Sequence, residues 1–282
     1  MPSGRYFRDE AIEPQLEIGQ DTIHLTQQLR FGTLHITLGG PDGVLIDAIK
    51  GGSLRILAGI VRRPPLWLIT KRSIKSFTDL RGANIGVLSL TEGSSKLLVK
   101  MTKAEALRVD EFKITRVGGA PMRHSLLKEG KIDAGMQPLP LNYEADDAGF
   151  NNLGWAGKYE PEWQFITVNA NVDWANQNGQ TASGFLRALL RGQQLITSNP
   201  SEAAQIAADE LKTSVKLAAR SLAEAVRLGI FDAGLEWSEL GLQRIFENMQ
   251  ADGTIGSEAK FELSNLVVKY YRHAARQSVG IK

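Results

Sequence analysis

The apolar positions in the first part of the chain fall into short runs that glycine, proline and polar residues separate. The run at 54–61 is largely apolar, as expected of a strand that is buried on both faces. These runs predict strands at 34–38, 54–61, 66–70, 84–88, 112–117, 132–136 and 165–168. Patterns typical of helices follow several of them, at 41–50, 96–107 and 122–129. This alternation predicts an α/β fold with mostly parallel sheets and helices on both faces. In such folds the loops at the carboxyl ends of the strands hold the ligand.

Beyond residue 182 the pattern becomes almost wholly helical. Apolar spacing predicts helices at 182–197, 200–211, 213–228, 237–250 and 256–277. Several of them have clear start signals, such as Asn199-Pro200, Thr213 and Ser238. We find no internal repeat or long linker in the sequence.

Composition and charge narrow the class of protein. The chain has 282 residues, of which 43% are hydrophobic and 23% charged, as in an ordinary globular protein with one large domain or two lobes. No run approaches the ~18 apolar residues of a membrane span, so we expect no direct membrane span. The net charge is only +2 and the Lys and Arg residues are scattered, so we expect no nucleic-acid partner.

Several kinds of chemistry lack support in the sequence. The chain has no cysteine, which excludes disulfides, thiolate zinc sites and cysteine nucleophiles. Its four histidines show no metal-ligand spacing, so we expect no metal site. No motif of a serine hydrolase, a nucleotide triphosphatase or a dinucleotide-binding protein occurs. We therefore expect no cofactor.

Two predicted helix starts that follow strands are candidates for anion binding. Gly39 and Gly40 allow the backbone to approach a ligand closely, and a helix can begin at Pro41. The segment Thr91-Glu92-Gly93-Ser94-Ser95 offers backbone N–H groups and hydroxyls to a carboxylate, sulfonate or phosphate. The alternative is an ordinary helix cap. Glu92 counts against a strongly anionic ligand unless its side chain points away.

Two arginines and a tryptophan near strand ends are further candidates. Arg63 follows a strand and Arg123 follows a Gly-Gly-Ala-Pro turn, and a guanidinium suits a carboxylate or sulfonate. The alternative is that each is solvated or paired with a neighbouring acid. Trp155, in a predicted loop after Leu153-Gly154, could stack on an aromatic or alkyl ligand. The alternative for this tryptophan is packing in the core.

Four segments of the chain resemble a known family. They are Gly-Arg-Tyr-Phe-Arg-Asp-Glu-Ala-Ile-Glu-Pro-Gln-Leu at 4–16, Ile-Thr-Leu-Gly-Gly-Pro at 36–41, Ile-Lys-Gly-Gly-Ser-Leu-Arg-Ile-Leu-Ala at 49–58 and Phe-Thr-Asp-Leu-Arg-Gly-Ala-Asn-Ile-Gly-Val at 77–87. Together they resemble the solute-binding proteins of ABC importers for sulfonates, nitrate, taurine and thiamine-pyrimidine precursors, with their enzymatic pyrimidine-synthase relatives.

The resemblance implies the type II periplasmic-binding-protein fold, in which two α/β lobes close on a ligand. Lobe one would comprise 1–68 plus 167–282 and lobe two 69–166, with crossing strands at Trp67–Thr70 and Phe165–Asn169. The implied ligand contacts are Gly39, Gly40, Pro41 and Arg63 in lobe one, and Thr91, Glu92, Gly93, Ser94, Ser95, Gly119, Arg123 and Gln137 in lobe two.

The resemblance also implies a strand that this sequence does not contain. In the family a first strand precedes the segment that corresponds to Tyr6-Phe7, but only five residues precede Tyr6 here. We therefore expect the first strand to be missing, through either a start placed too far downstream or a genuine variant. An open sheet edge would follow, which makes a homodimer by strand exchange a possible outcome.

Two functions are compatible with these observations. The first is a solute-binding protein that captures a small organic anion or heterocycle in a cleft between the lobes and presents it to an ABC permease. Resemblance places it in the periplasm or another extracytoplasmic space, whereas a native start at Met1 without a signal peptide would place it in the cytoplasm.

The second function is that of a cytoplasmic enzyme on the same fold, such as a decarboxylase of a small aromatic or carboxylic acid. There His124 or Glu92 would act as general acid or base and Arg123 would hold a carboxylate. The absence of cysteine disfavours the pyrimidine-synthase branch.

Overall fold

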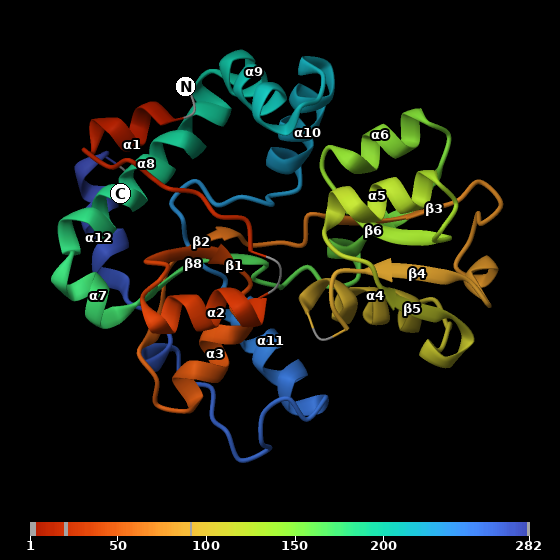
Figure 1. Cartoon of the computed structure of the whole chain (residues 1–282), viewed down its shortest axis with the longest axis horizontal. Coiled ribbons are helices and arrows are strands. Elements are labelled where there is room, and N and C mark those ends of the chain that lie inside the picture. Colours follow the sequence, from red (N-terminus) through yellow and green to blue (C-terminus); the bar gives the residue numbers. More distant parts are fainter. Residues whose placement is uncertain (1–3, 20–21, 91, 281–282) are drawn as a thin grey trace. The chain divides into compact units, whose positions relative to one another are not determined.

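The computed structural model describes residues 4–19, 22–90 and 92–280. They form two compact units, which we call unit 1 (1–63 and 162–282) and unit 2 (64–161). The predicted two-lobed α/β fold is confirmed, since each unit combines a sheet with helices (Figure 1). The chain passes between the units at 63–64 and at 161–162. Strand β3 (Leu66–Thr70), whose first half we placed in lobe one, lies wholly in unit 2 because it pairs with two strands there.

The sheet of unit 1 has, among the described residues, three strands in the order β1 (Ile36–Gly39), β8 (Ile166–Asn171) and β2 (Leu54–Val61). Strand β8 runs antiparallel to both of its neighbours. The helices of this unit are α1 (Arg5–Asp9), α2 (Thr22–Phe31), α3 (Asp42–Ile49), α7 (Val172–Gln177), α8 (Gly179–Ser198), α9 (Pro200–Leu211), α10 (Val215–Arg227), α11 (Glu239–Ala251) and α12 (Lys269–Ser278), with a 3-10 turn, η5 (Leu263–Asn265).

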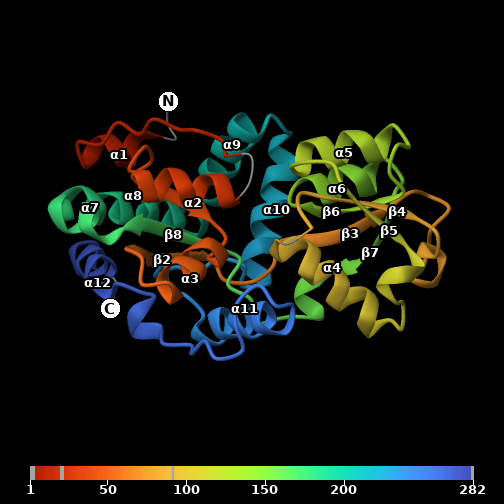
Figure 2. The same ribbon diagram turned by 60° about the horizontal axis from the view of Figure 1, so that its bottom comes forward.

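The core of unit 1 lies between this sheet and helices α8 and α12 (Figures 1 and 2). Helix α8 contributes Ala182, Leu186 and Leu190, which recur every four residues and so lie on one face. They are fully buried in one cluster with Val168 of β8 and Leu57 of β2. The periodicity of the sequence therefore predicts which side of α8 is buried.

The start signals of the C-terminal helices mostly act as predicted. The Asn199 side chain accepts a hydrogen bond from the Glu202 backbone at the start of α9, and the Ser238 hydroxyl accepts one from the Gly241 backbone at the start of α11. Helix α10 is capped by Ser214 rather than by Thr213. The predicted helix at 256–277 is wrong over its first half, because the chain around Val267 forms a parallel bridge to Ile56 of β2.

The sheet of unit 2 has the order β5 (Lys113–Arg116), β4 (Asn84–Val87), β6 (Ala134–Pro138), β3 and β7 (Asn151–Trp155). Its helices are α4 (Gly93–Ala104), α5 (Ala120–Lys128) and α6 (Leu141–Asp147), with 3-10 turns η2 (Thr78–Leu80), η3 (Val109–Glu111) and η4 (Ala156–Lys158). Helices α5 and α6 lie on one side of this sheet and α4 on the other (Figures 1 and 2).

The prediction of mostly parallel pairing was only partly right. Strand β4 is parallel to β5 and β6, as predicted. Every antiparallel strand pairing that the structure describes involves β3 or β8, the first strands after the two crossings between units. Strands β6 and β7, which α6 connects, both run antiparallel to β3 and therefore parallel to each other.

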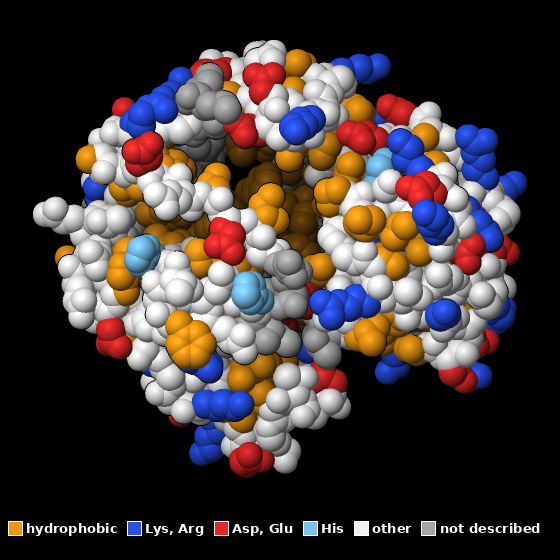
Figure 3. Space-filling view, in the orientation of Figure 1, with side chains coloured by type: hydrophobic (Ala, Val, Ile, Leu, Met, Phe, Trp, Pro, Cys, Tyr) orange, Lys and Arg blue, Asp and Glu red, His pale blue; other side chains and the backbone are white. Residues whose placement is uncertain are grey.

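The described helices include none long and apolar enough to cross a membrane. On the face shown in Figure 3, the Lys and Arg side chains are interspersed with Asp and Glu side chains rather than gathered in one stripe.

Candidate functional site

The candidate site lies in unit 2, at the carboxyl ends of the parallel strands β5, β4 and β6. Each strand ends in a short connection that leads into a helix: β4 into α4, β5 into α5 and β6 into α6. Strand β4 lies between the other two, so the three connections leave the same edge of the sheet. This is the edge at which open α/β sheets bind ligands.

Arg123 spans this edge. It lies in the first turn of α5 and is only 4% exposed. Its Nε donates to the Met136 carbonyl on β6 at 3.1 Å, and its Nη1 donates to the Gly118 carbonyl beyond β5 at 3.0 Å. Because β4 lies between β5 and β6, a side chain that bonds to both must cross the end of β4. Burial lowers the pKa of Arg123 to about 10, although the charge of Glu92 opposes this shift, so the group stays protonated at neutral pH.

The helix that follows β4 has an uncapped start. Glu92 holds the cap position of the 12-residue helix α4, and its side chain makes no capping hydrogen bond. Ser94, in the first turn, is 9% exposed, and its hydroxyl has no hydrogen-bond partner among the described residues. Ser95 instead donates to the carbonyl of Ser89. The alternative of an ordinary side-chain cap is therefore not what the structure shows at this helix.

Two of the other predicted residues of this region can be placed, and one cannot. Gly93 is the first residue of α4 and Gly119 holds the cap position of α5. The Gly119 carbonyl accepts a hydrogen bond from the Arg123 backbone at 3.0 Å. Thr91 lies outside the described residues.

Two carboxamides are buried on elements that contact Arg123 or its helix. Gln137, which we predicted, follows Met136 on β6, and Asn142, which we did not predict, lies in the first turn of α6. Both are 0% exposed, and none of their four amide atoms has a hydrogen-bond partner within the part of the chain that the structure describes. Asn142 follows a strand end of the sequence Gln-Pro-Leu-Pro, and this position at a helix start is the signal that could have identified it.

His124 adds a titratable group to the same region. It is 8% exposed, and its Nε2 lies 3.8 Å from the Glu144 carboxylate of α6. Its Nδ1 has no hydrogen-bond partner among the described residues. Burial lowers the pKa of this imidazole, against the opposing effect of Glu144, so His124 is neutral at neutral pH. The described residues contain no group of three or more His, Asp and Glu that could hold a metal ion.

The Trp155 side chain packs against other residues of unit 2. Its Nε1 donates to the Pro64 carbonyl at 2.6 Å, and its ring stacks on Trp67 with 6.3 Å between ring centroids. Trp67 pairs in register with both Trp155 and Gln137, so these three side chains lie on one face of the sheet. The packing alternative that we kept for Trp155 therefore describes its contacts in the structure.

The remaining predicted residues belong to unit 1. Gly39 ends β1, and its carbonyl accepts from the Thr167 hydroxyl at 3.2 Å. Pro41 holds the cap position of α3 rather than its first turn, and Gly40 precedes it. Arg63 donates through Nη1 to the Leu228 carbonyl at 3.0 Å, at the end of α10, so it secures a helix terminus. These residues are thus used, at least in part, to hold unit 1 together.

Sequence reasoning missed a buried polar network beside Gly39. The Thr167 hydroxyl donates to the Asn169 Oδ1 atom at 2.7 Å, and the Asn169 amide donates to the Thr37 hydroxyl at 3.4 Å. All three residues are at most 8% exposed. The residues alternate along β8 and lie opposite one another on β1 and β8. The sequence could have indicated this network only if the pairing of these two strands had been known.

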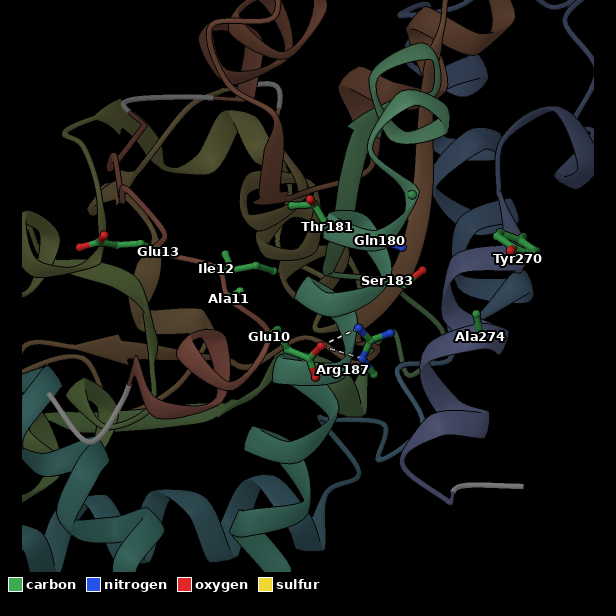
Figure 4. A pocket seen from close by; sticks show the side chains of 11 residues that line it. Glu10, Ala11, Ile12, Glu13, Gln180, Thr181, Ser183, Arg187, Tyr270 and Ala274 are labelled. Atoms are coloured by element: carbon green, nitrogen blue, oxygen red, sulfur yellow. Dashed lines mark hydrogen bonds and ion pairs between the residues drawn. The ribbon is translucent and has the colours of Figure 1, made fainter.

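A large cavity lies elsewhere, in unit 1, and none of the predicted residues lines it. Its volume is about 1030 Å³, and it lies between residues 10–13, the start of α8 and α12 (Figure 4). Arg187 bonds to the Glu10 carboxylate there at 2.9 and 2.5 Å, and this contact lowers the pKa of Glu10. Because these two charged groups of the cavity are paired with each other, volume alone does not make it the better candidate.

Comparison with known proteins identifies the family. The family model described as NMT1/THI5 like matches residues 3–203. The chain belongs to the NMT1/THI5-like family. The match confirms the resemblance and covers all of unit 2. No curated protein matches this NMT1/THI5-like chain by sequence.

Solved structures share the fold of this NMT1/THI5-like protein at low identity. A ligand-binding component of an ABC-type import system from Staphylococcus aureus, with zinc bound, has a TM-score of 0.74 and 13% identity over 97% of this chain and 92% of its own. A putative periplasmic sulfonate-binding protein, SsuA, from Methylobacillus flagellatus KT has a TM-score of 0.68 and 16% identity. The match covers 99% of this chain and 86% of that protein. A mutant of the desulfurization enzyme DszB, in complex with biphenyl-2-sulfinic acid, has a TM-score of 0.69 and 14% identity. The match covers 98% of this chain and 94% of that protein. At these identities the likeness concerns the fold.

Proposed function

We propose that this protein is a solute-binding protein that captures a small organic anion at the strand-end site of unit 2. The observation that carries the proposal is Arg123, a buried guanidinium held across the end of β4. Among the described residues no carboxylate lies within ion-pair distance of it. A buried charge is costly without a partner of opposite sign, and an anionic ligand supplies that partner.

Neighbouring groups suit the same ligand. The first turn of α4 presents N–H groups without a side-chain cap, and a helix N-terminus attracts anions. The Ser94 hydroxyl can donate a hydrogen bond to the same ligand. Glu92 weakens the attraction of the site for anions, because its negative charge acts on Arg123. The site therefore favours an anion of moderate charge density, such as a monocarboxylate or sulfonate, over a phosphate.

The family and the structural relatives support a role in solute capture. Two of the similar structures are described as parts of ABC import systems, one of them as sulfonate-binding. On this support we extend the proposal to an ABC permease as partner and to an extracytoplasmic location. A heterocyclic ligand that carries an acidic group is compatible with the same site.

A binding screen with recovery of the ligand tests the proposal. Sulfonates, aliphatic and aromatic carboxylates, nitrate, phosphonates and pyrimidines are added to the purified protein, and thermal unfolding is followed. A ligand that binds the folded state raises the melting temperature by an amount that grows with its excess over Kd. Stabilisation by an acid that is recovered unchanged supports solute capture. The proposal fails if no organic anion stabilises the protein, or if Arg123→Met is stabilised as much as the wild type.

A catalytic role is the second candidate, and His124 is the observation that favours it. A buried neutral imidazole beside Glu144, with Nδ1 free of partners among the described residues, can accept a proton from a substrate bound at Arg123. The similarity to DszB shows that this fold also serves an enzyme. Mass spectrometry of the stabilising acid after incubation decides between the two. Conversion that His124→Gln abolishes would establish catalysis.

We also propose a homodimer through the free edge of β1. This strand pairs only with β8 among the described residues, and Leu38 on it is 48% exposed. Leu16 and Ile18, in the irregular segment before α2, are 91% and 96% exposed. Light scattering that gives a monomeric mass at high protein concentration would exclude the dimer.

A further inference from the structure

The two buried carboxamides of unit 2 require an explanation beyond anion binding. Gln137 and Asn142 are both 0% exposed, and all four of their amide atoms lack partners among the described residues. Buried polar atoms in native proteins are nearly always hydrogen-bonded, because an unpaired one loses its hydration without compensation. An anion bound to Arg123 resolves at most half of this, since a carboxylate can pair with the amide N–H groups but offers nothing to the amide oxygens.

Both amides lie on elements that contact Arg123 or its helix. Met136, whose carbonyl accepts from Arg123 Nε, directly precedes Gln137. The Gln137 amide lies next to Gly135, since a Cβ at that position would be 3.6 Å from Nε2 of Gln137, an ordinary van der Waals distance. Asn142 is in the first turn of α6, which packs against α5, the helix that carries Arg123 in its first turn. Gln137 and Asn142 therefore belong to β6 and α6, the elements that flank Arg123 and its helix.

We infer that the ligand is an organic acid that also carries an uncharged donor–acceptor edge, such as a carboxamide, a lactam or a ureide. This inference rests on the proposed function, because it assigns the acidic group of the ligand to Arg123. A carboxamide offers an N–H donor next to a carbonyl acceptor, which matches the N–H and carbonyl of another amide. Gln137 and Asn142 form hydrogen bonds with this donor–acceptor edge, while Arg123 and the start of α4 bind the acidic group.

The same amides act against purely apolar acids. An alkyl or aryl tail placed against them would leave their donors and acceptors buried and unpaired. Sites built to hydrogen-bond a ligand reject analogues that lack the matching group far more strongly than apolar pockets reject an extra methylene. The pair thus confers specificity that Arg123 alone does not supply.

Matched ligands test the inference. Succinamate and 4-methylpentanoate have the same shape, but an amide in the first is an isopropyl group in the second. Malonamate and glutaramate, each with its branched isostere, vary the spacing between acid and amide. Titration calorimetry on the wild type should show tighter binding of the amide acid, by about 10- to 100-fold, at the spacing that fits the site. Equal affinity within every pair would overturn the inference.

Variants separate the two proposals. Gln137→Met and Asn142→Leu keep side-chain size but remove the amide, so each should lower the preference for the amide acid and leave 4-methylpentanoate bound at least as tightly. The melting temperature of ligand-free Gln137→Met should equal or exceed that of the wild type, because the lost group has no partner there. A preference retained in both variants, or a large fall in that melting temperature, would overturn the assignment. Arg123→Met should weaken both acids alike. If it weakens neither, or if no acid binds the wild type, the proposed function fails and this inference fails with it.

Discussion

Replacing Arg123 by methionine tests whether this side chain serves the ligand or the fold. Burial lowers the pKa of the guanidinium to about 10, well below its ordinary value, and this shift corresponds to roughly 3 kcal/mol at about 1.4 kcal/mol per pKa unit. Methionine removes this penalty together with two hydrogen bonds to carbonyls, each worth about 1.5–3 kcal/mol when the donor is charged. The gain offsets much of the loss. We expect the free energy of unfolding of the ligand-free variant to lie about 0–3 kcal/mol below that of the wild type.

Ligand binding should respond much more strongly than stability. Truncating one partner of a buried charge pair costs about 2–5 kcal/mol, or about 30- to 5,000-fold in affinity. At an anion concentration 100 times the wild-type Kd, the ligand should stabilise the wild type by about 2.7 kcal/mol and the variant by less than about 1 kcal/mol. Urea unfolding with and without the ligand measures both quantities.

Two results would refute this reasoning. One is a variant that keeps its full ligand-induced stabilisation, and the other is a ligand-free variant destabilised by more than about 5 kcal/mol, the upper range for breaking a buried pair. Arg108→Met is the matched control, because Arg108 lies in the same unit, its side chain is 73% exposed and, among the described residues, it pairs with the neighbouring Asp110. It should change neither ligand binding nor stability measurably.

Three further predictions follow from other contacts. Glu92→Gln should tighten anion binding by roughly 3- to 10-fold in calorimetry, because it removes a negative charge that acts on Arg123. Since burial lowers the pKa of His124 below 6.5, the unfolded chain protonates first, and the free energy of unfolding should fall as the pH drops below about 6.5; His124→Gln should flatten that slope. Gly59→Ala should lower the free energy of unfolding by about 1–3 kcal/mol, because its Cβ would lie 2.6 Å from backbone atoms, whereas Gly192→Ala, in open space on α8, should raise it by up to about 1 kcal/mol.

The fold was predictable wherever local signals decide the structure. Helix α9 occupies the predicted range of 200–211, because Asn199 and Pro200 fix its start through local contacts. The apolar run at 54–61 is strand β2 as predicted. The failures concern distant partners. The helix predicted at 256–277 begins only at Lys269, since the chain around Val267 bridges to Ile56 more than 200 residues earlier.

The candidate site was predictable to the level of its loops. Its position follows from the alternation of strands and helices, and Ser94, Arg123 and Gln137 lie near the strand ends of unit 2. That these residues bind a ligand stays a prediction. The function of each side chain depends on contacts that the sequence does not reveal. Arg63 bonds to a carbonyl 165 residues away and Trp155 to one 91 residues away, and both contacts serve packing.

Two buried arginines show what separates a structural residue from a candidate ligand contact. Arg272 is 3% exposed and Arg123 is 4% exposed, and both are helical residues that sequence patterns cannot distinguish. Arg272 pairs with the Glu236 carboxylate and lies 4.6 Å from the centre of the Trp237 ring, so its charge is compensated within unit 1. Among the described residues, Arg123 donates hydrogen bonds only to carbonyls. Folding buries both guanidinium groups, but within the described part of the chain it places a carboxylate at ion-pair distance from Arg272 and not from Arg123. The charge of Arg123 is therefore the one that a ligand can complete.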